Sequence, residues 1–100
     1  MTYDAVVIGA GHNGLAAAVE LQSKGWSVAV VEGKPVAGGA VKTREVTLPG
    51  FRHDLCAMNL SMFAGSAFFN ANKEALLANG LGFVPAADCF ASVFRDGSYL

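Results

Sequence analysis

The stretch that decides the fold runs from Tyr3 to Glu32 and reads YDAVVIGAGHNGLAAAVELQSKGWSVAVVE. It contains the apolar, largely β-branched run AVVI at residues 5–8, which is typical of a buried strand in a parallel sheet. The alanine-rich segment from Leu15 to Lys24 has helical composition, and Gly25 after it favours a helix stop. Ser27 to Glu32 predicts a second buried strand. Strand, helix and strand together predict a βαβ unit with a parallel sheet, in the α/β class.

The turn between the first strand and the helix has the sequence GAGHNG at residues 9–14. Gly9 permits a tight turn, Gly11 lets the backbone approach a pyrophosphate, and Gly14 lets the helix pack close to the strand. The first helical N–H groups, near His12 and Asn13, would face the phosphates, where the helix dipole favours negative charge. These residues are therefore candidates for binding a dinucleotide. His12 is expected to act as a backbone donor and not as a catalytic group.

Glu32 stands at the end of the second predicted strand. A carboxylate at this place can accept hydrogen bonds from ribose hydroxyls, and it would repel a 2′-phosphate. We therefore expect Glu32 to hold the adenosine ribose and expect NADP to be disfavoured.

The residues after Glu32 carry a resemblance to a known family. GKPVAGGAVKT at residues 33–43 resembles the second glycine motif of large FAD-dependent oxidoreductases, in which a Gly-Gly pair follows the ribose acid. With the loop at 9–14 and PGFRHD at 49–54, the chain resembles the phytoene desaturase-like branch of FAD-dependent, amine oxidase-type flavoproteins. The resemblance implies that Gly39 and Ala40 lie toward the flavin side of the cofactor. That family group often has Arg after the ribose acid, whereas this chain has Gly33 and Lys34.

The resemblance also implies a domain organisation and an activity. Residues 1–100 would be the N-terminal part of an incomplete Rossmann-like FAD- or NAD(P)-binding domain with an additional β-hairpin, and the substrate domain would be absent from this chain. The full-length protein would be an FAD-dependent, phytoene dehydrogenase-like oxidoreductase acting on a small apolar or amine-like substrate. This chain would bind the ADP moiety of FAD and would be inactive by itself. No catalytic residue follows from the resemblance. Arg52, His53 and Asp54 could lie near the flavin or could serve as exposed and turn-stabilising residues.

Two other functions stay open at this point. An NAD-binding dehydrogenase module needs a helix and a third parallel strand soon after residue 40, and Pro49-Gly50 and Pro85 argue against both. A non-catalytic truncated piece would instead bind partners through its apolar surface. The remaining predicted elements are strands at Val41–Leu48, Phe51–Leu55, Phe83–Val84 and Phe90–Phe94, a helix at Ser66–Asn79 stopped by Gly80, and a hairpin turn at Asp96-Gly97.

The composition bounds the possible partners. Hydrophobic residues make up 53% of the chain and charged residues 15%, so apolar surface should remain for another segment or a second copy to cover. The net charge of −1 gives no basic footprint for nucleic acid. Cys56 and Cys89 lack the spacing of zinc or redox motifs. We expect two buried free thiols, no metal site and a cytoplasmic location. The apolar stretch Leu55 to Phe69 is too short to span a bilayer and is expected to be buried core, with a membrane-surface or lipidic-substrate contact as the alternative.

Overall fold

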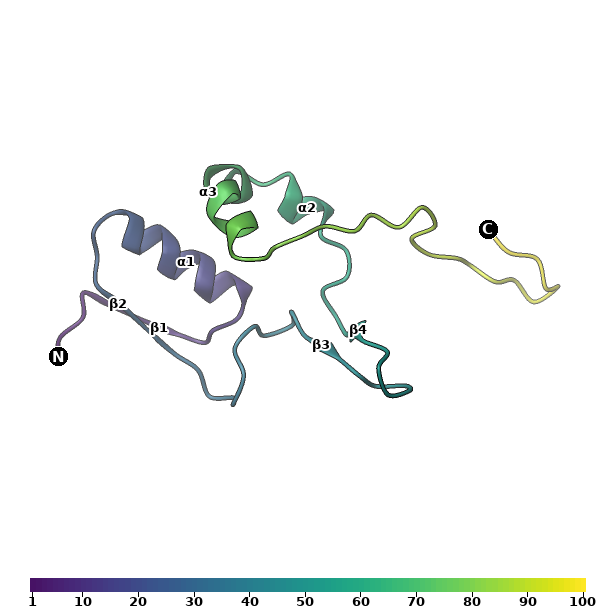
Figure 1. The fold of residues 1–100 in the computed structure, drawn as a ribbon, viewed down its shortest axis with the longest axis horizontal. Helices are drawn as coiled ribbons and strands as arrows, with labels where there is room; N and C mark the ends of the chain where they lie inside the picture. Colours follow the sequence, from purple (N-terminus) through teal and green to yellow (C-terminus); the bar gives the residue numbers. More distant parts are fainter.

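The computed structural model describes residues 1–100 and contains the predicted βαβ unit. Strand β1 (Ala5–Ile8) pairs in parallel with β2 (Val28–Val31), with Ala5 opposite Val28 and Ile8 opposite Val31. Helix α1 (His12–Ser23) joins the two strands and runs beside them (Figure 1). The helix begins at His12 and not at Leu15, so the end of the glycine loop forms its first turn. The prediction of a Rossmann-like α/β fold with an incomplete parallel sheet is confirmed.

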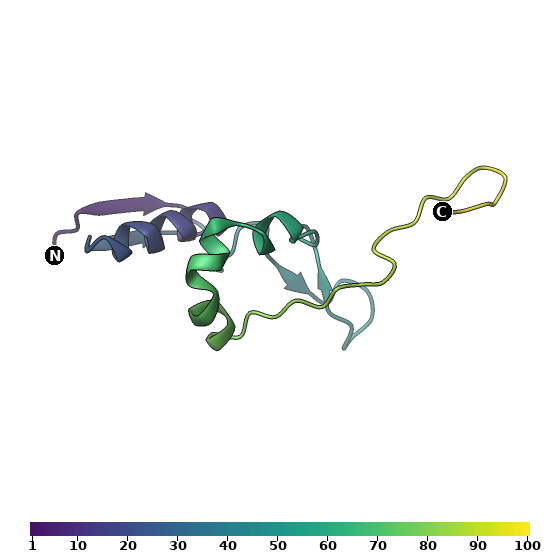
Figure 2. The same cartoon turned by 90° about the horizontal axis from the view of Figure 1, so that it is seen from above.

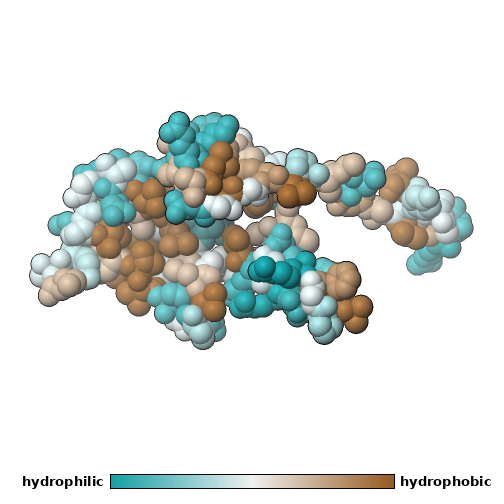
Figure 3. Space-filling view, in the orientation of Figure 1, coloured by the Kyte–Doolittle hydropathy of each residue, from teal (hydrophilic) through white to brown (hydrophobic).

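The two faces of the β1–β2 sheet differ in cover. The Val7 side chain points toward α1, because a Cβ placed on Gly14 would lie 3.3 Å from Val7 Cγ1. Val6 and Ile8 alternate with it and lie on the opposite face, where they are 58% and 89% exposed. Figure 3 shows apolar side chains gathered over this part of the molecule. One sheet face is therefore packed and the other is open.

A helical pair follows the sheet in the chain. Helix α2 (Ser61–Ala64) was not predicted, whereas α3 (Ala67–Ala78) confirms the predicted helix. Ser66 caps α3, because its Oγ accepts the Phe69 N–H at 3.1 Å. The rings of Phe63, Phe69 and Phe83 pack together with centroids 5.5 to 6.4 Å apart. This small aromatic cluster holds the helical pair together.

Downstream of residue 40, two of the predicted strands form at the expected places but are shorter than predicted, and the other two predictions are wrong. Strand β3 (Thr43–Arg44) pairs antiparallel with β4 (His53–Asp54), and these short strands replace Val41–Leu48 and Phe51–Leu55. No strand forms at Phe83–Val84, and Phe90–Phe94 contributes only a single bridge between Val93 and Tyr99. These segments have no neighbouring sheet on which to pair. The Asp96-Gly97 turn is confirmed, since Gly97 N–H donates to the Phe94 carbonyl at 3.0 Å.

The molecule is elongated, at 62 × 29 × 25 Å. Its radius of gyration of 17.7 Å exceeds the roughly 13 Å of a compact domain of this length. Its accessible surface is 8352 Å², compared with about 5,400 Å² for a folded chain of this mass. Residues 84–100, here called the arm, extend away from the rest (Figure 1), and Figure 2 shows the same from above. The expectation of uncovered apolar surface is therefore confirmed.

Several predictions about burial need correction. The two strands of the βαβ unit were expected to be buried, but no residue of β1 or β2 is buried. Only Ala10 and Phe69 are buried, so Leu55 to Phe69 is not a buried core, and Met62 within it is 90% exposed. Cys56 and Cys89 are free, as expected, but both are exposed. The physical reason is shared, because no further layer of structure lies over these segments. None of the helices is long and apolar enough to cross a membrane.

Candidate dinucleotide-binding site

The glycine loop leaves β1 through a residue with positive φ. Gly9 has φ of +98°, a region that side chains disfavour, and its N–H donates to the Val31 carbonyl at 2.7 Å. Gly11 is the N-cap of α1, and no side chain caps this terminus. The first helical N–H groups, including those of His12 and Asn13, have no partner within the helix. The loop therefore presents free donors at the positive end of a helix, which is the arrangement expected for binding phosphate.

Gly14 has the packing role that its place in the motif predicts. A Cβ on Gly14 would overlap the Gly9 carbonyl oxygen and would lie within 3.3 Å of Val7 Cγ1. Any side chain here would push α1 away from β1. Glycine at this position therefore fixes the distance between helix and strand.

The second glycine pair lies directly on the first loop. Gly38 N–H donates to the Ala10 carbonyl at 2.7 Å, and Gly11 and Gly38 form a parallel bridge. A Cβ on Gly39 would lie 3.0 Å from Gly11 Cα, and Gly39 has φ of +59°. The structure thus brings together two motifs that are well separated in the sequence, with Ala40 next to them in the chain.

Glu32 points back into the same loop. Its Oε2 accepts the Ala10 N–H and its Oε1 accepts the Lys34 N–H, each at 2.8 Å. These backbone donors, that of Ala10 first, lower the pKa of the Glu32 carboxyl, and Lys42 adds a smaller coulombic effect. These backbone partners could not be predicted, because the sequence of a strand-end acid is the same whether its carboxylate accepts from a peptide N–H or from a ribose hydroxyl. The ribose contact of Glu32 stays a prediction.

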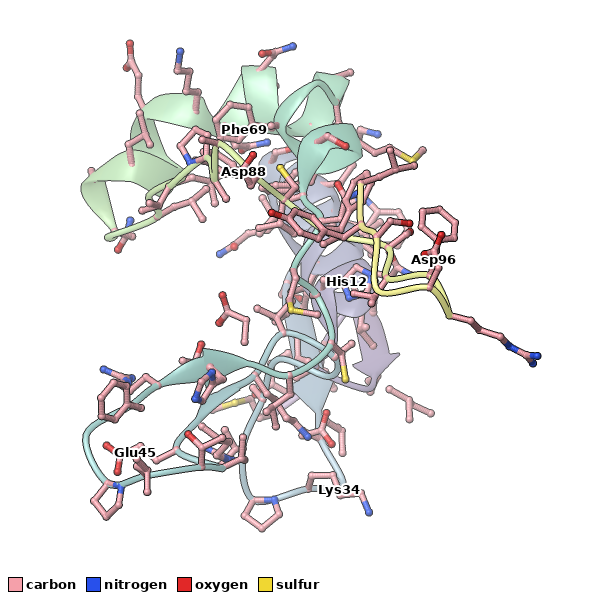
Figure 4. All side chains as sticks on the ribbon, turned by 90° about the vertical axis from the view of Figure 1, so that its right-hand side faces the viewer. His12, Lys34, Glu45, Phe69, Asp88 and Asp96 are labelled. Carbon is pink, nitrogen blue, oxygen red and sulfur yellow. The ribbon has the colours of Figure 1, made fainter.

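An apolar cavity adjoins the start of α1. It has a volume of about 390 Å³. Its lining residues come from four segments and are His12, Val41, Ala57, Asn59, Leu60, Met62, Phe63 and Leu81. Figure 4 shows His12 in the middle of the molecule, between Phe69 on the helical pair and Glu45 on the β3–β4 hairpin. The cavity was missed from the sequence, where the apolar run at 55–69 was its only sign.

The polar residues of the β3–β4 hairpin bond to one another. Thr43 Oγ1 donates to Asp54 Oδ1 at 2.5 Å, and Thr47 Oγ1 lies 2.8 Å from His53 Nε2. Arg52, His53 and Asp54 are all exposed. These contacts favour a structural role for His53 and Asp54. The proximity of Arg52, His53 and Asp54 to a flavin stays a prediction. No three His, Cys, Asp or Glu side chains gather closely enough to hold a metal ion.

The βαβ unit, the glycine loop and the strand-end acid define a Rossmann-like domain of the dinucleotide-binding type. Comparison with known proteins identifies it further: residues 7–73 match the model of the NAD(P)-binding Rossmann-like domain, and the chain belongs to this family.

Three relatives illustrate the similarity. The mouse pyridine nucleotide-disulfide oxidoreductase domain-containing protein 2 is 53% identical over 60 residues, covering 60% of this chain and 10% of the relative. The 1-hydroxycarotenoid 3,4-desaturase of a Flavobacterium species is 47% identical over 51 residues, covering 51% and 10%. The neurosporene-forming phytoene desaturase of Cereibacter sphaeroides is 47% identical over 51 residues, also covering 51% and 10%. The chain thus spans about a tenth of the length of the curated relatives it matches. No solved structure matches. The predicted resemblance to flavoprotein-type oxidoreductases that include desaturases is confirmed.

Proposed function

We propose that this chain binds the ADP moiety of FAD as part of an FAD-dependent oxidoreductase. The observation that carries the proposal is the packing of the second glycine pair on the first loop, through the 2.7 Å bond from Gly38 N–H to the Ala10 carbonyl. The sequence of this second motif resembles that of FAD enzymes. The names of the relatives, which include two desaturases and an oxidoreductase domain, support the same class.

The residues present fit such a cofactor. The N–H groups of Gly11, His12 and Asn13 would face the pyrophosphate, and Glu32 would accept from the adenosine ribose with its remaining lone pairs. Gly39 and Ala40 would continue along the cofactor. The cavity beside His12 is within the usual volume range of ligand pockets, and its apolar wall suits the ring end of the cofactor. When bound, the flavin supplies the redox chemistry, and the protein binds and orients it.

The activity of the complete protein is a wider proposal. We infer oxidation of a small apolar or amine-like substrate, with hydride transfer to the flavin and with a substrate domain outside residues 1–100. The hundred-residue chain alone would be inactive. The apolar surface over β1 and β2 would be covered by other parts of the protein or by a second copy. A cytoplasmic location and the absence of nucleic-acid partners belong to the same proposal. Contact of the apolar surface with a membrane is the alternative to its burial by protein.

Titration of the chain with FAD and with NADH, side by side, tests the cofactor. Saturable binding of FAD with loss of flavin fluorescence is expected, together with weaker binding of NADH. Free ADP should displace FAD, since the proposed site holds the ADP moiety. Absence of FAD binding would contradict the proposal for this chain.

An NAD-binding module is the second candidate, and one observation favours it: the matching family is described as NAD(P)-binding. Against it, residues 43–54 form an antiparallel hairpin, where such a module needs a helix and a third parallel strand. Tighter binding of NADH than of FAD in the same titration would decide for this candidate. NADP should bind more weakly than NAD, because Glu32 would repel the 2′-phosphate.

A further inference from the structure

We propose that Glu32 is a positioning residue that clamps the glycine loop before any cofactor binds, by holding the peptide group on the N-terminal side of Ala10. The ribose-binding role predicted for strand-end acids concerns the bound ligand. The clamp concerns the shape of the empty loop. The clamp rests on the proposed function in one respect, which is that this loop binds the phosphates of the cofactor.

Ala10 is the point where three segments meet. It is one of two buried residues, at 5% exposure. Its N–H donates to Glu32 Oε2 at 2.8 Å, and its carbonyl accepts from Gly38 N–H at 2.7 Å. The end of β2, the first glycine loop and the second glycine pair are therefore joined through a single residue. A buried N–H that loses its partner is costly, so the loop depends on the Glu32 carboxylate for its conformation.

The chemistry of the clamp requires a glutamate. Each carboxylate oxygen holds one backbone donor, Oε2 that of Ala10 and Oε1 that of Lys34. Gln offers a single acceptor oxygen and would turn an NH₂ group toward the other donor. Asp keeps both oxygens but is one methylene shorter. Either substitution should release at least one of the two bonds.

Amide hydrogen exchange on the free chain tests the clamp directly. In Glu32→Gln, the amides of Ala10 and Gly38 should exchange about tenfold faster, as expected for the loss of one positioning hydrogen bond. The β1–β2 ladder amides should be unchanged. Glu20→Gln is the matched control, because Glu20 lies on α1 and pairs with Lys24 at 3.1 Å. Equal exchange at Ala10 in the wild type and in Glu32→Gln would overturn the proposal.

A second measurement needs no variant. In a pH titration of the wild-type chain by NMR, the amide chemical shifts of Ala10 and Lys34 should change with the same midpoint. This midpoint should be the pKa of Glu32, which lies below its ordinary value of 4.5. The clamp would be overturned if the Ala10 amide shift did not change as Glu32 titrates, or if this amide exchanged as fast as one in an unstructured peptide.

Inorganic pyrophosphate separates the clamp from ribose recognition, because it has no ribose. If Glu32 positions the loop, Glu32→Gln should bind pyrophosphate about tenfold more weakly, although the substitution removes a negative charge. Unchanged or tighter binding would show that Glu32 acts only on the ribose. The two proposals can fail separately. A coupled Ala10 amide without FAD binding rejects the proposed function alone, and FAD binding without that coupling rejects the clamp alone.

Discussion

The βαβ unit at residues 3–32 and the arm at residues 84–100 have similar sequence patterns but form different amounts of regular secondary structure. Both have short apolar runs beside a turn with glycine. In the βαβ unit, the runs form a parallel pair with a helix on one face. In the arm, they form a single antiparallel bridge, and every residue is exposed.

The difference shows what organises this chain. Neither region has a large core, since only two residues are buried in the whole molecule. The βαβ unit is ordered by close approach at Gly14 and by the hydrogen bonds that meet at Ala10. The arm has only hydrogen bonds within itself, such as the backbone pair between Ser92 and Leu100. The shape of the candidate site therefore depends more on close backbone contacts at glycines and on hydrogen bonds than on the burial of apolar side chains.

Gly14→Ala should give the largest effect in the βαβ unit. The added Cβ overlaps the Gly9 carbonyl, and forcing such an overlap should lower the free energy of unfolding by about 3 kcal/mol. Urea denaturation followed by the fluorescence of Trp26, which lies in this unit, measures the change. Gly82→Ala is the control, because its Cβ would meet no atom within 4 Å, and it should change stability by less than about 0.5 kcal/mol. Equal midpoints for the two variants would refute the close approach.

Gly39→Ala should have the next largest effect, on ligand binding. A side chain at φ of +59° costs about 1–2 kcal/mol, and the Cβ would press against Gly11 Cα. The two glycine motifs should separate, and FAD affinity should fall about tenfold, as measured by fluorescence titration. Gly50→Ala carries similar strain at φ of +87° in open space, so it should leave the affinity unchanged. An equal loss in both variants would mean that strain alone lowers the affinity.

The sequence was informative where the signal is local. The strands at 5–8 and 28–31, the helix before Gly80 and the packing role of Gly14 all depend on neighbours within one element or one turn. The lengths of β3 and β4 were overestimated because strand length depends on pairing partners that are distant in the sequence. The exposure of Cys56 and Cys89 was missed for the same reason, since apolar composition does not say which layer covers a segment.

The candidate site was predictable in its members but not in its internal bonds. The glycines and Glu32 follow a spacing that the sequence displays, and the structure places them together. The Ala10 bonds to Glu32 and Gly38 depend on how two loops fold back on each other, which no local pattern records. The cavity beside His12 combines four segments and was not predictable either.

Acid should weaken the βαβ unit by a smaller amount. Asp4 Oδ2 accepts the Ser27 Oγ–H at 2.6 Å and the Ser27 N–H at 2.8 Å, and these bonds lower the Asp4 pKa below 3.8. A lowered carboxyl pKa stabilises the fold above the unfolded value, and this contribution is lost as the pH falls through the folded value. Protection of the β1–β2 amides should therefore hold down to about pH 4 and then decline.

Ser27→Ala sharpens this test. Removal of the hydroxyl should move the Asp4 midpoint back toward its ordinary value, so that less protection is lost as the pH falls. Carboxyl titration of Asp4 by NMR in both forms gives the two midpoints. Identical midpoints would mean that the Ser27 hydroxyl bond does not form in solution.

Asp96→Ala should have the smallest effect on the molecule as a whole. Asp96 Oδ1 accepts from the N–H and the Oγ–H of Ser98, at 3.0 and 2.6 Å, and these bonds lower the Asp96 pKa. Their loss should change the amide shifts of Phe94 and Ser98, because the turn depends on them. The unfolding midpoint reported by Trp26 should stay the same, since the arm extends away from the βαβ unit (Figure 1). A shift of that midpoint would show that the arm packs on the βαβ unit in solution. The contrast between an ordered unit and an independent arm would then no longer hold.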